Sequence, residues 1–178
     1  MRNISHSQVD CVNLTMETQR NQVAPVEMKI GLYPIVELND TLIPLGGPGL
    51  FPEFKSEDQL WSYVAGHGLT KAHFNALVKF SKFPQVRLCE ILQITARTIQ
   101  NWKLDDVFDI NRSEKMVYLA MLFDIADKFY EDRLEFAAWL HIPSKDTDNR
   151  PPVDYLTTVY GIQKLAGLLW AAAEGNYE

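Results

Sequence analysis

The sequence predicts an all-α fold, and three observations support this prediction. From Ser56 onward, apolar residues recur at spacings of three and four, which is the period of an amphipathic helix. Residues that start or stop helices, such as Ser56, Thr70 and Pro84, bracket these segments. Runs of β-favouring residues lie between residues 28 and 54, where glycines and prolines interrupt them. We therefore expect a helix-turn-helix bundle followed by a small helical domain, preceded by an irregular or short-hairpin N-terminal extension.

The first 55 residues have the weakest structural pattern. Residues 1–25 are polar and aperiodic, which is typical of a flexible tail. Residues 28–54 contain the runs MKIGLYPIVEL and TLIPL, for which we expect extended loop or a small hairpin rather than helix. The predicted organisation is a tail and irregular extension over residues 1–55, a helix-turn-helix domain over 56–110 and a C-terminal helical domain over 111–178.

Seven helices are expected after residue 55. They cover residues 56–66, 70–83, 85–92, 95–103, 111–129, 132–140 and 156–174. Ser56, Thr70 and Thr95 provide hydroxyl groups that can cap three of them. The polar, proline-terminated segment over residues 143–152 is predicted to be a loop.

The composition is that of a soluble globular protein. Of its 178 residues, 47% are hydrophobic, and the longest apolar run is about half of the roughly 20 residues that a membrane span requires. The polar N-terminus lacks the apolar stretch of a secretory signal. The two cysteines, Cys11 and Cys89, have no metal-ligand spacing around them. We expect a cytoplasmic protein with reduced thiols, no metal and no cofactor.

Charge is unevenly distributed along the chain. The net charge of −6 divides into −4 over residues 1–69, +5 over residues 70–103 and −7 over residues 104–178. Neutralising the phosphates of a nucleic acid takes only a few well-placed cations. The basic segment therefore indicates a surface for a polyanion, although solvated lysines on an ordinary helix face would give the same count.

The basic segment contains the layout of a helix-turn-helix. Residues 85–103 comprise an apolar-faced helix, a tight break at Gln93 and Ile94, and a short helix that begins at Thr95. In such a unit the second helix enters the major groove, so its outward side chains meet base edges. Ala96, Ile99 and Trp102 are the residues expected to face inward.

The outward positions have the chemistry of base recognition. Arg matches the O6/N7 edge of guanine, and Gln or Asn matches the N6/N7 edge of adenine. Arg97 and Gln100 are therefore the first candidates for base contacts. The predicted DNA-binding residues are Arg87, Thr95, Arg97, Thr98, Gln100, Asn101 and Lys103, with Lys79 and Lys82 as further phosphate contacts. The alternative is a short exposed helix of a helical bundle without a nucleic-acid ligand.

Four segments are similar to segments of one known family. They are ITARTIQNWK (residues 94–103), SEKMVYLAML (113–122), FAAWLHIP (136–143) and RPPVDYLTTVYGIQKLAGLLWAAAEGNYE (150–178). On these residues the chain resembles the Xre/MbcA/ParS antitoxin family, whose members join a Xre-like helix-turn-helix to a C-terminal toxin-binding domain. The segment SKDTDNR departs from the family's pattern, and residues 1–55 match no part of it.

The resemblance implies a partner and a mechanism. The partner is a RES-domain toxin, from an enzyme family that depletes NAD, and the antitoxin blocks its active site with C-terminal residues while repressing its own operon. The expected toxin-binding residues are Trp170, Glu174, Asn176, Tyr177 and Glu178. Trp and Tyr are enriched at interfaces, and we expect the Glu178 side chain and the terminal carboxylate to mimic dinucleotide phosphates. A frayed, solvent-exposed terminus is the alternative.

Two other functions compete with this interpretation. Catalysis has little support, because His6, His67, His73 and His141 are scattered without a nucleophile or metal pattern. The acidic residues Asp105, Asp106 and Asp109 are expected to form a loop and a helix cap. We therefore expect no enzyme activity. The remaining alternative is a dimeric helix-turn-helix repressor without a toxin, and a homodimer is expected in either case because such proteins bind two half-sites.

Overall fold

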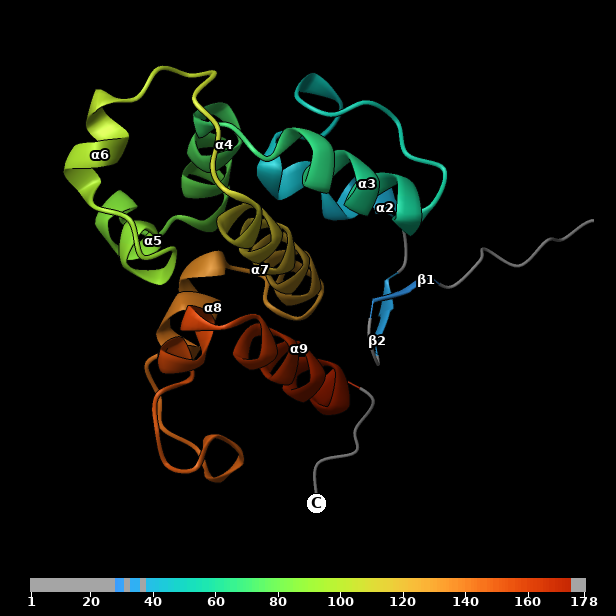
Figure 1. Ribbon diagram of the computed structural model, residues 1–178. Helices are drawn as coiled ribbons and strands as arrows, with labels where there is room; N and C mark the ends of the chain where they lie inside the picture. Colours follow the sequence, from blue (N-terminus) through green and yellow to red (C-terminus); the bar gives the residue numbers. More distant parts are fainter. Residues whose placement is uncertain (1–27, 31–32, 36–37, 174–178) are drawn as a thin grey trace, which may run out of the picture.

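The computed structural model describes residues 28–30, 33–35 and 38–173, and it confirms the all-α fold (Figure 1). An antiparallel hairpin pairs β1 (Met28–Ile30) with β2 (Tyr33–Ile35). The α-helices and 3₁₀ helices (η) that follow are α2 (Leu38–Thr41), η1 (Ile43–Leu45), η2 (Gly47–Gly49), α3 (Glu57–His67), α4 (Lys71–Ser81), α5 (Gln85–Ile91), α6 (Ala96–Asn101), α7 (Ile110–Phe129), α8 (Arg133–Trp139), η3 (Lys145–Thr147), η4 (Pro152–Thr157) and α9 (Val159–Ala173). Within the described ranges, no helix combines the length and the apolarity needed to cross a membrane.

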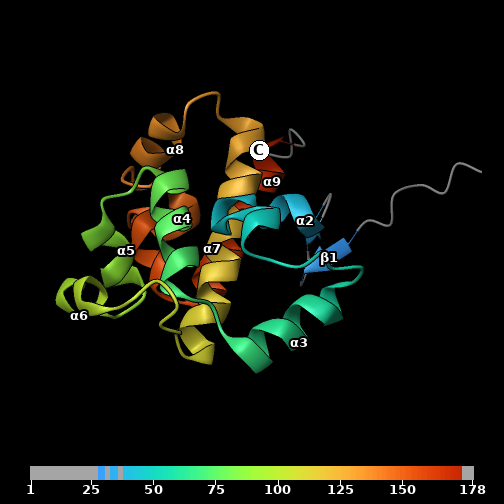
Figure 2. The same cartoon turned by 90° about the horizontal axis from the view of Figure 1, so that it is seen from above.

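Helix α7 runs through the centre of the molecule. It is buried around most of its circumference, which requires neighbours on several sides. Helices α3 and α4 pack against it, and α9 packs along it (Figures 1 and 2). One hydrophobic cluster extends from Leu42 through Met116 to Leu165. The predicted regions 56–110 and 111–178 therefore share a core through α7.

Residues 38–54 differ from the prediction. The small hairpin is confirmed by the pairing of residues 28–30 with residues 33–35, but α2, η1 and η2 occupy the part where we expected loop. Leu42 and Leu45 are 1% and 0% exposed, and η1 packs on α4 and α7. The interpretation of every Pro and Gly as a breaker was wrong here because a 3₁₀ turn accepts them: Pro44 lies in the first turn of η1, where its missing N–H is not needed. The tail predicted over residues 1–25 lies outside the described residues.

Three helices, α3, α4 and α6, start at the capping residues that the sequence predicted. The Ser56 hydroxyl accepts the Gln59 N–H at 3.3 Å, and the Thr95 hydroxyl accepts the Thr98 N–H at 3.0 Å. At α4, the Thr70 N–H donates to Nδ1 of His73 at 3.0 Å, so a histidine takes the place of the usual Glu of a capping box. His73 is only 4% exposed, and burial lowers its pKa below the ordinary histidine value. A neutral ring suits the acceptor role of Nδ1.

Candidate nucleic-acid interface

Helices α5 and α6 have the layout of a helix-turn-helix. Gln93, the second residue after α5, adopts a left-handed conformation with φ of 54°. The Ile94 N–H donates to the Cys89 carbonyl at 3.0 Å and closes the turn, as in common helix C-terminal motifs. The chain then enters α6 at Thr95, so four residues connect the two helices. Buried Leu88 and Ile99 anchor the pair to the core.

The two faces of α6 differ in the way the sequence predicted. Ile99 is fully buried, and Ala96 and Trp102 pack against the core. Arg97, Gln100 and Asn101 are exposed and lie at spacings of three and four, so they share the outward face. Helix α6 lies at the edge of the molecule in both views, away from α9 (Figures 1 and 2). Its polar face is therefore accessible to a large ligand.

The remaining α6 residues stabilise its first turn. The hydroxyls of Thr95 and Thr98 lie 2.7 Å apart, and Thr95 also caps the helix. Thr95 is exposed, whereas Thr98 is half-buried. Lys103 is exposed just beyond α6, and its N–H donates to Asp106 Oδ2 at 2.7 Å. The structure thus groups five of the predicted residues, Thr95, Arg97, Gln100, Asn101 and Lys103, at or beside the outward face of α6, with Thr98 underneath.

Two other predicted phosphate contacts, Lys82 and Arg87, lie elsewhere. Arg87 forms an ion pair with Glu90 at 2.7 Å. With Lys82 it lines a groove of about 270 Å³ whose opposite wall is formed by α8 residues Ala137 and Ala138. The structure therefore places Lys82 and Arg87 beside α8. An exposed ion pair contributes at most about 1 kcal/mol, so the pair does not by itself prevent Arg87 from binding a phosphate.

Two cations from α7 hold the turn between α5 and α6. Arg112 Nε donates to the Leu92 carbonyl at 2.9 Å, and its Nη2 donates to the Gln93 carbonyl at 2.8 Å. Lys115 Nζ donates to the Ile91 carbonyl at 3.3 Å and to the Thr157 carbonyl at 2.6 Å. These contacts satisfy the orphan carbonyls at the negative end of α5. We call this pair the α7 clamp.

The α7 clamp has two structural consequences. It fixes the angle of the helix-turn-helix against α7, and through Thr157 it ties the same turn to η4. Burial, and then the nearby Arg112 charge, lower the pKa of Lys115. Sequence reasoning missed the clamp. Its one local sign is the position of Arg112 in the first turn of α7, where the helix dipole disfavours a cation.

Among the acidic residues after α6, Asp106 lies in the loop and Asp109 caps α7, as we expected for a loop and a helix cap. Asp106 accepts the Lys103 N–H, and Asp109 accepts the Arg112 N–H at 3.0 Å at the start of α7. The Arg112 guanidinium also pairs with the Asp109 carboxylate. Across the described ranges, no group of three His, Cys, Asp or Glu residues is arranged to hold a metal ion.

The predicted toxin-binding residues are only partly within the described structure. Trp170 is half-buried, although a toxin-binding side chain would be expected to face solvent, because its ring packs edge-on against Phe129 with centroids 6.2 Å apart. It therefore helps to attach α9 to α7. Glu174, Asn176, Tyr177 and Glu178 lie outside the described residues.

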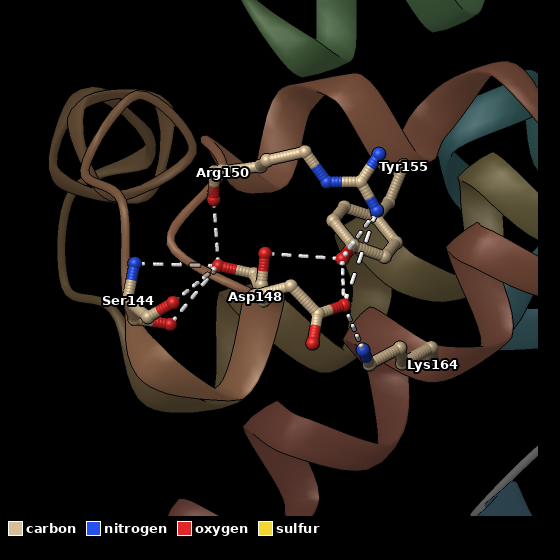
Figure 3. A network of polar contacts seen from close by, with 6 residues as sticks. Ser144, Asp148, Arg150, Tyr155 and Lys164 are labelled. Carbon is tan, nitrogen blue, oxygen red and sulfur yellow. Dashed lines mark hydrogen bonds and ion pairs between the residues drawn. The ribbon is translucent and has the colours of Figure 1, made fainter.

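The predicted loop before α9 is ordered by a polar network (Figure 3). The Tyr155 hydroxyl lies 2.9 Å from Asp148 Oδ2 and accepts a hydrogen bond from Arg150 Nη2 at 3.0 Å. Lys164 Nζ of α9 lies 3.7 Å from the same Asp148 oxygen. The Tyr155 hydroxyl, followed by the Lys164 charge, lowers the pKa of Asp148. The network joins the loop to the first half of α9.

The entry into α9 requires a glycine. A Cβ on Gly161 would lie 2.0 Å from the Tyr155 carbonyl oxygen, which no side chain can tolerate. The Gly161 N–H donates to the Thr158 hydroxyl at 3.0 Å, and Thr158 thus helps to cap α9. The sequence between Pro152 and Gly161 therefore encodes one tight structural unit.

Comparison with known proteins leaves the family open. The sequence matches no protein-family model, and it matches no curated protein sequence.

Proposed function

We propose that this protein is the antitoxin of a toxin–antitoxin pair, which binds operator DNA through α6 and neutralises a RES-domain toxin through its C-terminal region. One observation carries the DNA half: Arg97, Gln100 and Asn101 share the exposed face of a helix-turn-helix second helix. Each of these side chains has two polar atoms that can match a base edge in the major groove. The side-chain chemistry of α6 and its position at the edge of the molecule both support DNA as the ligand.

The geometry supports a role for each residue of the proposed DNA interface. Arg97 and Gln100 contact bases, while Asn101 and Lys103 extend the contact toward the next base pair and the backbone. The Thr95 hydroxyl and the start of α6 approach a phosphate. Ile99 holds the helix from below, and the α7 clamp sets its angle. DNA binding serves to repress the antitoxin's own operon.

The toxin half rests on the four segments that resemble the Xre/MbcA/ParS family. The close approach of Gly161 to Tyr155 and the network around Asp148 give physical reasons for residues in the last of these segments. Trp170 supports α9, and the residues beyond it, Glu174, Asn176, Tyr177 and Glu178, block the active site of the toxin. The physical basis for the block is the combination of carboxylates with an aromatic side chain, which suits a dinucleotide pocket.

Co-expression with the protein encoded by the neighbouring gene tests this proposal. The full chain is compared with a chain truncated after Ala173, which keeps every contact described above. We expect both to fold and to bind DNA equally, and only the full chain to rescue growth and to be recovered with the neighbour. If the truncated chain rescues growth equally, the C-terminal mechanism is wrong. If neither chain binds the neighbour, the repressor without a toxin replaces the antitoxin.

A further inference from the structure

Helix α6 depends on contacts with the rest of the molecule to keep its position. It has 6 residues, and a helix shorter than about 12 residues is at best marginally stable on its own. The α7 clamp holds the turn before it. At its other end, the Lys71 ammonium of α4 donates to the Trp102 carbonyl at 2.7 Å. Trp102 is the C-cap of α6, where a helix leaves carbonyls without an internal partner.

The segment that follows α6 is attached to the start of α4 by main-chain hydrogen bonds. The Lys71 N–H donates to the Asp106 carbonyl at 2.9 Å, and the Ala72 N–H donates to the Leu104 carbonyl at 3.0 Å. Both N–H groups belong to the first turn of α4, which has no internal acceptors for them. Figure 1 shows this segment passing one end of α4 on its way from α6 to α7. The start of α4 is therefore a fixed base from which the Lys71 side chain reaches the end of α6.

Lys71 differs from the other lysines of the basic segment. Lys79, Lys82 and Lys103 are exposed, whereas Lys71 is half-buried. None of the ion pairs among the described residues includes Lys71. Its contact with the Trp102 carbonyl is a charge-assisted hydrogen bond, which is stronger than a bond between neutral groups. The Lys71 charge is thus directed at the end of α6 and not at solvent.

We propose that Lys71 is a positioning residue for DNA recognition, which holds the C-terminal end of α6 through the Trp102 carbonyl and does not itself contact DNA. Asn101 is the last residue of α6 and directly precedes Trp102, so its place depends on this bond. Arg97 lies in the first turn of α6, next to the turn that the α7 clamp holds. Lys71 therefore determines the base-pair contact of Asn101 more than that of Arg97. This inference rests on the proposed DNA binding and adds a specificity-determining residue to it.

Anisotropy titrations of the full chain with the duplex upstream of its own gene test the positioning role. Lys71→Met removes the donor and keeps the aliphatic part of the side chain. Lys145→Met is the matched control, because it removes the same charge from an exposed residue of the C-terminal loop, and it should bind like the wild type. We expect Lys71→Met to bind at least about fivefold more weakly, with the slope of log affinity against log salt unchanged, because no phosphate contact is lost. A slope shallower by about one would show a direct phosphate contact, and an unchanged affinity would show no role. Either result overturns the proposal.

Double-mutant cycles locate the effect of Lys71 along α6. Asn101→Ala and Arg97→Ala are each measured alone and together with Lys71→Met. We expect Asn101→Ala to have little further effect in the Lys71→Met background, because the Asn101 side chain is already displaced. Arg97→Ala should cause the same fold-loss of affinity in either background. A general loss of stability would not produce this difference. Equal coupling of Lys71 to both residues, or to Arg97 alone, contradicts the proposal.

Hydrogen exchange without DNA tests the structural contact separately. The Trp102 N–H donates to the Ile99 carbonyl at 3.3 Å and reports on the last turn of α6. We expect its exchange to accelerate in Lys71→Met and in Lys71→Ser, which keeps a polar residue at the start of α4, while the amides of α7 keep their wild-type rates. Equal exchange at Trp102 in these variants and in Lys145→Met would show that Lys71 does not hold α6. A wild type that binds no duplex would overturn the proposed function and the recognition role together, whatever the exchange rates show.

Discussion

Helices α6 and α8 have the same construction but different outer faces. Each is a short surface helix held by one fully or nearly fully buried side chain, Ile99 in α6 and Phe136 in α8. Outward, α6 presents Arg97, Gln100 and Asn101, whereas α8 presents Leu134 and Ala138. The polar face can form directional hydrogen bonds with base edges, and the apolar face gains free energy only by excluding water. The comparison shows that two short helices anchored in the same way expose side chains of different chemistry.

Truncating the two buried anchor side chains should have the largest effect on stability. The two losses should be similar, because both helices are attached to the core in the same way. We expect Phe136→Ala to reduce the free energy of unfolding by about 3–5 kcal/mol and Ile99→Ala by about 2–5 kcal/mol, because each leaves a cavity in a packed core. Urea unfolding followed by circular dichroism measures both losses. A loss below about 1 kcal/mol at either position would show that its helix is not attached as described.

Substitutions on the polar face of α6 should reveal the difference between the two helices, because they change DNA binding and not stability. We expect Arg97→Ala to weaken operator binding by about 1–3 kcal/mol, which is roughly 5-fold to 150-fold, without changing the unfolding free energy. Arg150→Ala is the matched control, because it removes the same charge from an exposed residue of the C-terminal loop. Fluorescence anisotropy with a labelled duplex measures both affinities. Equal losses in the two variants would mean that only total charge matters.

The α7 clamp offers a smaller and indirect test of α6. Arg112→Met removes the bonds to the Leu92 and Gln93 carbonyls and keeps most of the side-chain volume. We expect a stability loss of about 1.5 kcal/mol, at the low end for charged hydrogen bonds because Arg112 is partly exposed. Hydrogen exchange at the Ile94 amide should accelerate and operator binding should weaken. Arg112→Lys should not restore either property, since one ammonium group cannot reproduce the planar fork of the guanidinium.

The free energy of unfolding of the fold that supports both helices should depend on pH. Burial lowers the pKa of His73 in the folded state, so its neutral form stabilises the protein. This stability is present above the unfolded histidine pKa of about 6.5 and is lost as pH falls through the lower folded pKa. His73→Gln keeps an acceptor for the Thr70 N–H and does not titrate. Below pH about 6.5 its unfolding free energy should therefore fall less steeply than that of the wild type. His67→Gln replaces an exposed histidine and serves as the comparison variant.

The sequence predicted those parts of the structure that local chemistry determines. The starts of α3, α4 and α6 follow from Ser56, Thr70 and Thr95, whose hydroxyls act within four residues. The inward and outward faces of α6 follow from the helical period, because Ile99 and Trp102 lie on the face opposite Arg97 and Gln100. The position of Asp109 as the cap of α7 also follows from its local spacing.

The parts that the sequence did not predict depend on distant contacts. Leu42 and Leu45 become core residues only because η1 packs on α4 and α7. Arg112 and Lys115 reach carbonyls that lie about 20 or more residues away in the chain, which no local pattern indicates. Trp170 packs on Phe129 because α9 lies along α7. The same reasoning applies to Leu134 of α8, which is 64% exposed although it is an apolar residue of an amphipathic pattern.

Binding of the wild-type protein to the DNA upstream of its own gene tests the central claim most directly. Anisotropy titrations should compare that duplex with a shuffled duplex of equal length and composition over a series of salt concentrations. The account predicts that the upstream duplex binds at least about 10³-fold more tightly and that affinity for both falls as salt rises. Equal affinity for the two duplexes, or binding to neither, would contradict the assignment of α6 as a recognition helix.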